Sequence, residues 1–126
     1  MKSIPKQVRN WFKIHFLIDM FVAFPLFFAP VSFLAFFGFD PLAVDPSLSR
    51  IVASAFFAIG GMSLWMNTER FESFIVMLRL KLIWSASATL GLLWGALEGG
   101  PSILWFFAAI FGAFFVLWQY WYNQIQ

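Results

Sequence analysis

The chain has no cysteine, a single histidine and few charged residues. Without cysteine, the chain cannot form disulfides, thiolate metal sites or cysteine nucleophiles. One histidine and scattered carboxylates do not make a metal-ligand set. The sequence also contains neither a glycine-rich phosphate loop nor a serine in a nucleophile-elbow motif. We therefore expect no metal, no cofactor and no catalytic residues, and we favour a protein that is not an enzyme.

The charge is also too small to support binding to nucleic acid. Eight basic residues stand against six acidic ones, which leaves a net charge of +2. The basic start of the chain, MKSIPKQVRNWFK, is not followed by a short apolar region with a small-residue cleavage site. We expect this N-terminus to be retained, with the first apolar helix acting as its own insertion signal.

Hydrophobic residues dominate the composition of the chain. They make up 62% of the 126 residues, and charged residues only 11%. Soluble domains have about 45–50% apolar and about 25% charged residues. The excess apolar surface needs an apolar solvent, which predicts a multi-pass membrane protein that forms a single domain over residues 1–126.

Four apolar segments lie between the polar residues, at 20–39, 51–66, 82–97 and 103–118. A helix rises about 1.5 Å per residue and must cross about 30 Å of hydrocarbon, so flanking residues have to extend these segments. We expect spans over about 12–38, 49–67, 74–97 and 101–121. Backbone groups in lipid must find partners within the segment, so the spans must be helices. The predicted fold is an all-α, integral membrane four-helix bundle.

Local signals mark where these helices start and bend. Asp45 followed by Pro46 is typical of an N-cap and a first helical position, and Pro101 suits another helix start. Pro25 and Pro30 lack an amide hydrogen, so we expect them to bend the first helix.

Basic residues predict the orientation. Seven of the eight fall before the first span or between the second and third: Lys2, Lys6, Arg9, Lys13, Arg70, Arg79 and Lys81. Only Arg50 falls on the opposite side. The positive-inside rule then places both termini in the cytoplasm, and tryptophans and tyrosines near the predicted span ends agree with this threading.

Two pairs of polar residues lie at comparable depth near the cytoplasmic side. His15 and Asp19 are four apart and share a helix face, and Asp19 is placed to meet Arg79 or Lys81 across the bundle. Such a cluster could relay protons or hold an anionic head group. The alternative is structural: if hydrocarbon begins near residue 20, the cluster lies in the interface and joins two helix ends.

On the outer side, we expect a loop ion pair formed by Arg50 with Asp40 or Asp45. Small residues should allow close helix packing, and the candidates are Gly60, Gly61, Gly91, Gly95 and Gly112. Gly91 and Gly95 have GxxxG spacing, which fits either packing within the bundle or a homodimer seam. The many phenylalanines either face lipid or line a hydrophobic ligand cavity.

The stretch FFAPVSFLAFFGFDP, followed by RIVASAFFAIGGMSLW, resembles the first two helices of small DoxX-like four-helix membrane proteins. Those proteins commonly have a proline near the outer end of the first helix, then a glycine, an acidic loop and an arginine that opens a small-residue second helix. The resemblance covers about residues 20–65. It implies a bundle in the bacterial inner membrane, often a subunit or accessory protein, and it transfers no site residues.

Three functions remain open. The first is a non-enzymatic protein that binds membrane lipids, a lipid-like hydrophobic ligand, a membrane protein partner or a second copy of itself. The second is a small oligomeric transporter or channel that uses His15, Asp19 and Arg79 or Lys81. The third, which the sparse chemistry supports least, is an enzyme that modifies lipids.

Overall fold

The computed structural model describes residues 3–66 and 70–125, and within these ranges the chain is helical and contains no strand. The helices are α1 (Lys6–Phe28), α2 (Pro30–Phe36), α3 (Pro46–Trp65), α4 (Phe71–Leu97) and α5 (Ile103–Ile125). Four of them, α1, α3, α4 and α5, are long and apolar enough to cross a membrane. The prediction of an all-α chain with four membrane-spanning helices is therefore confirmed.

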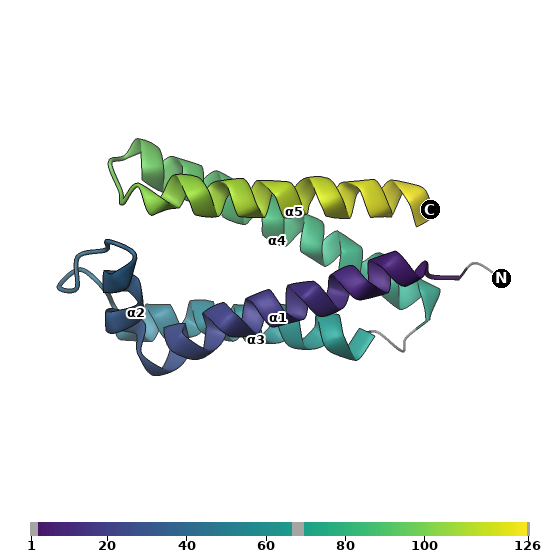
Figure 1. Cartoon of the computed structure of the whole chain (residues 1–126), viewed down its shortest axis with the longest axis horizontal. Coiled ribbons are helices and arrows are strands. Elements are labelled where there is room, and N and C mark those ends of the chain that lie inside the picture. Colours follow the sequence, from purple (N-terminus) through teal and green to yellow (C-terminus); the bar gives the residue numbers. More distant parts are fainter. Residues whose placement is uncertain (1–2, 67–69, 126) are drawn as a thin grey trace. The chain divides into compact units, whose positions relative to one another are not determined.

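The helices form two compact units. In the first, which we call the N-terminal unit, α1 and α3 run antiparallel side by side, and short α2 contacts both (Figure 1). In the second, the C-terminal unit, α4 and α5 form an antiparallel hairpin (Figure 1). Each unit is thus a helical hairpin whose core lies along the seam between its two long helices.

The start of α3 has the predicted cap. One carboxylate oxygen of Asp45, Oδ1, accepts hydrogen bonds from the backbone amides of Ser47 at 2.8 Å and Leu48 at 3.1 Å. Pro46 occupies the first helical position, where its missing amide hydrogen costs nothing. The predicted end of this span, residue 67, lies outside the described residues, as do Lys2 and most of the connection to α4.

The first span was predicted as a single bent helix over 12–38, and the structure has two helices in this region instead. The helix continues through Pro25 and ends at Phe28, and Ala29 has the non-helical dihedrals φ −141° and ψ 60°. A second helix then starts with Pro30 at its first position. Pro30 has no amide hydrogen to donate to the carbonyl of Leu26, so the series of helical hydrogen bonds is interrupted here. Helix α1 ends at this interruption, and α2 starts after it.

The turn between α4 and α5 depends on a glycine conformation. Gly99 has φ +90°, a region that residues with a Cβ rarely adopt. The amides of Gly99 and Gly100 donate to the carbonyls of Ala96 and Gly95, which satisfies the last turn of α4. Helix α5 starts two residues after Pro101.

Hydroxyl groups within the spans also find partners inside their own helices. Each donates to a backbone carbonyl one turn earlier, at 2.6–2.8 Å: Ser54 to Arg50, Ser63 to Ile59, Ser85 to Lys81, Ser87 to Ile83 and Thr89 to Ser85. Since lipid offers no hydrogen bonds, this local bonding makes these residues compatible with an apolar surrounding.

Candidate functional site

His15 and Asp19 form a buried pair on α1. The imidazole Nε2 lies 3.4 Å from Oδ1 of the Asp19 carboxylate, as the four-residue spacing predicts. His15 is 3% exposed and Asp19 is 2% exposed. Asp19 is the fourteenth of the 23 residues of α1, about 20 Å from the start of the helix. Both side chains therefore point into the protein.

Gly60 of α3 determines how closely α3 approaches this pair. A Cβ atom at Gly60 would lie 2.6 Å from Cβ of Asp19 and 2.9 Å from Cε of Met20. Real Cβ atoms do not approach other atoms this closely, so only glycine fits. One turn later Ser63 is fully buried, and its hydroxyl donates to the carbonyl of Ile59 at 2.6 Å. The buried carboxylate of Asp19 thus lies against α3 at Gly60.

This arrangement places two ionisable groups next to each other and away from the molecular surface. Ionisable residues in spans are rare because burying a charge is costly, and they commonly mark ion pathways or proton relays. Histidine also exchanges protons near neutral pH. The pair is chemically able to hold and release a proton.

In the C-terminal unit, Lys81 and Arg79 of α4 have different surroundings. Lys81 is fully buried, and its Nζ lies 4.8 Å from the ring centre of Trp118 on α5, which is a cation–π contact. Arg79 is exposed, and its Nε donates to the hydroxyl of Tyr122 at 3.0 Å. Residues two apart on a helix point in different directions, so the two basic residues cannot have the same role.

The sequence did not identify these aromatic partners. Trp118 and Tyr122 were interpreted only as anchors at the membrane boundary, whereas in the structure they contact the two basic residues of α4. Their four-residue spacing, which places both on one face of α5, was the available signal. The predicted contact of Asp19 with Arg79 or Lys81 would join the two units and stays a prediction.

The residues of the predicted outer loop have partners other than those expected. Arg50 donates from Nε to the backbone carbonyl of Phe27 at 3.1 Å. The Oδ1 atom of Asp40 accepts from the amide of Leu42 at 3.0 Å, and Asp45 caps α3. These three described residues form no ion pair with one another. The physical reason is that α1 ends at Phe28, which leaves its last carbonyls without helical donors, and Arg50 supplies one.

The five candidate packing glycines separate into two groups. Gly60 is in close contact with α1, a Cβ at Gly95 would lie 3.3 Å from Leu104, and one at Gly112 would lie 3.8 Å from Thr89. A Cβ at Gly61 or Gly91 would meet nothing within 4 Å. Packing inside a hairpin therefore involves Gly60, Gly95 and Gly112.

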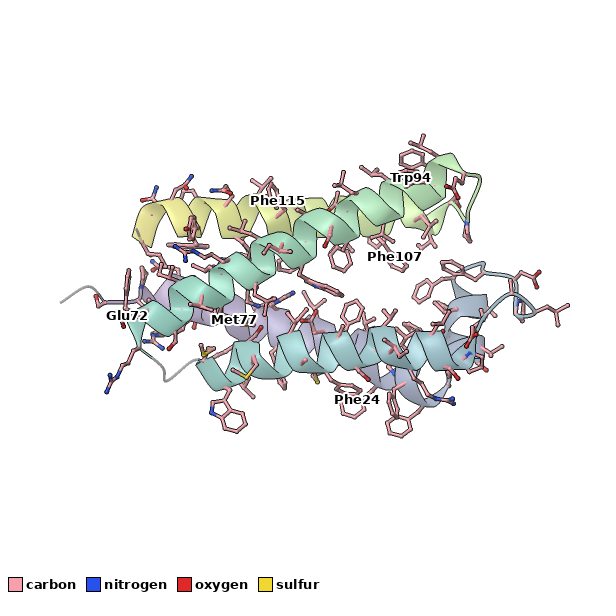
Figure 2. The ribbon with its side chains drawn as sticks, turned by 180° about the vertical axis from the view of Figure 1, so that it is seen from behind. Phe24, Glu72, Met77, Trp94, Phe107 and Phe115 are labelled. Atoms are coloured by element: carbon pink, nitrogen blue, oxygen red, sulfur yellow. The ribbon has the colours of Figure 1, made fainter. Side chains whose placement is uncertain are left out.

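An apolar groove lies between α1 and α2, entirely within the N-terminal unit. Its volume is about 640 Å³. Figure 2 shows Phe24, one of its lining residues, with its side chain projecting away from the ribbons of this unit. The groove is lined only by apolar residues of α1, of α2 and of the α2 C-cap: Leu17, Met20, Phe21, Phe24, Pro25, Phe33, Phe36 and Phe37. It exists because the chain turns at Ala29 and α2 does not continue the line of α1.

Comparisons of the chain with protein-family models, curated proteins and solved structures find no match. The resemblance to DoxX-like proteins therefore stays a prediction.

The Gly60 contact gives a direct test of the α1–α3 seam. Gly60→Ala should lower the stability of the protein by about 1–3 kcal/mol, the usual cost of overpacking, because the new methyl group collides with Asp19. Thermal unfolding in mild detergent, followed by circular dichroism, measures this. The neighbouring Gly61→Ala is the matched control, since its methyl group meets open space. Equal unfolding temperatures for the two variants would contradict the seam.

Proposed function

We propose that this chain is a non-enzymatic membrane protein that binds a lipid-like hydrophobic molecule in the groove between α1 and α2. The observation that supports this is the groove itself, which is lined by eight apolar residues and has a volume of about 640 Å³. Ligand sites commonly have volumes of about 300–1,000 Å³. The occupant that fits best is an acyl chain of a membrane lipid.

The chemistry of the lining argues for an acyl chain over a polar ligand. Since all the lining residues are apolar, nothing in the groove would replace the hydrogen bonds that a polar ligand loses on leaving water. An acyl chain is surrounded by apolar groups both in the bilayer and in the groove, so its affinity for the groove comes from the fit of the two surfaces and not from removal of apolar surface from water. Five phenylalanines supply that surface, among them Phe21 and Phe36, which are 78% and 83% exposed.

The groove proposal predicts that lipid retention depends on the lining. Phe21→Ala should reduce the lipid that co-purifies in mild detergent by about fivefold, the equivalent of roughly 1 kcal/mol of lost contact. Native mass spectrometry of the purified chain measures it. Trp65→Ala is the matched control, because Trp65 is an aromatic residue of the same unit, is 72% exposed and does not line the groove. Equal lipid loss in both variants, or a second protein chain in place of lipid, would contradict the proposal.

We also propose that the protein lies in the bacterial inner membrane with both termini in the cytoplasm. The support is the distribution of basic residues, seven against one between the two sides. The expected result is that a reporter that is fluorescent only in the cytoplasm works at either terminus, and that a phosphatase active only outside works when inserted at Leu42, an exposed loop residue. Termini on opposite faces would refute this threading.

The buried pair of His15 and Asp19 favours a second candidate, a small transporter that moves protons. A carboxylate and an imidazole enclosed on a spanning helix could accept a proton that crosses the hydrophobic layer.

Proton flux into liposomes tests this second candidate. Asp19→Asn should abolish flux, because the amide cannot take up a proton as the carboxylate does. The control is Asp40→Asn, which changes an exposed loop carboxylate and should leave the rate unchanged. A wild-type rate no higher than that of empty liposomes, or unchanged flux in Asp19→Asn, would remove the candidate.

A further inference from the structure

Arg50 occupies an unusual position at the outer end of the N-terminal unit. It is the fifth residue of α3, is exposed, and reaches across to α1, where its Nε donates to the carbonyl of Phe27 at 3.1 Å. A guanidinium group has five N–H donors in a rigid fork. This bond uses the one on Nε and fixes the orientation of the group, so the four N–H donors on the two terminal nitrogens lie at the exposed end of the side chain.

The same residue is connected to the wall of the groove. Phe57 lies two turns after Arg50 on the same face of α3. Its ring contacts Phe24, which lines the groove, with 5.0 Å between the ring centres, and Phe27 with 6.0 Å. Phe27 follows Phe24 by one turn, about 4.5 Å along the axis. Arg50 is therefore held roughly one turn beyond the groove wall formed by Phe24.

The nearby acidic residues do not neutralise this charge. Asp40 accepts from the amide of Leu42, and Asp45 accepts from the amides at the start of α3. Neither forms an ion pair with Arg50 in the described part of the chain. An arginine in the first turns of a spanning helix lies near the level of the lipid head groups, and the guanidinium fork matches the geometry of a phosphate.

We infer that Arg50 binds the phosphate of a phospholipid whose acyl chain lies in the groove between α1 and α2. This rests on the proposed function and extends it from an acyl chain to a class of lipid. The groove supplies the contact with the chain, and Arg50 supplies two or more charge-assisted hydrogen bonds to phosphate oxygens. A lipid with the same chains and no phosphate would occupy the groove without this second contact.

The test compares two lipids with identical acyl chains, phosphatidylglycerol and diacylglycerol. The full chain in mild detergent is incubated with an equal mixture, and the lipid that co-elutes with the protein is quantified by mass spectrometry. Wild type should retain about tenfold more phosphatidylglycerol than diacylglycerol, the size expected for hydrogen bonds to a charged group. Arg50→Gln should bring the ratio close to one and leave diacylglycerol retention unchanged. Arg70→Gln, an exposed arginine at the start of α4, should keep the wild-type ratio.

Two further measurements separate the possible failures. Rising salt should lower the ratio of phosphatidylglycerol to diacylglycerol that wild type retains, since exposed charges are screened. This measurement uses wild type alone and therefore does not depend on whether Arg50→Gln folds. Excess inorganic phosphate should leave diacylglycerol bound. It should compete only weakly with phosphatidylglycerol for Arg50, because inorganic phosphate has no acyl chain to place in the groove. Retention of both lipids in equal amounts by wild type would overturn the role of Arg50 and leave the groove proposal standing. Retention of neither would overturn the groove proposal itself.

Discussion

The requirement that backbone polar groups find partners inside an apolar surrounding governs much of this structure. It explains why the spans are helical, why Ser63 and Ser85 bond to carbonyls of their own helices, and why two of the helix ends carry a substitute hydrogen-bond partner. At the start of α3 the substitute is the carboxylate of Asp45, which accepts the free amides. At the end of α1 it is the guanidinium of Arg50, which bonds the carbonyl of Phe27.

Some of these hydrogen-bond partners could be predicted from the sequence, and others could not. Asp45 and Pro46 are a local signal, and the cap they predict is present. The two prolines of the first span are locally equivalent, because each removes one amide hydrogen. Helix α1 continues through Pro25 and ends before Pro30. The carbonyl of Phe27 at this helix end is bonded by Arg50, which is 23 residues away in sequence, so no local signal could have predicted this contact.

The candidate site likewise contains features that the sequence predicts and features that it does not. The pairing of His15 with Asp19 follows from helical spacing alone and is present. The distinction between Gly60 and Gly61, or between Lys81 and Arg79, depends on the rotation of a helix about its axis. Sequence composition does not determine that rotation when nearly every position around the helix is apolar. Only the packing of α1 on α3 and of α4 on α5 identifies the inward-facing member of each pair.

The division of the first span into α1 and α2 also affects how the protein fits its membrane. Helix α1, with 23 residues, is about 35 Å long and can cross the hydrocarbon layer without help, whereas α2, with seven residues, is about 10 Å long. The segment after Ala29 contacts both α1 and α3 and does not continue the line of α1. The apolar residues of α2 therefore add to the width of the N-terminal unit at one end of α1, and the length that the bilayer has to match at this position is that of α1 alone.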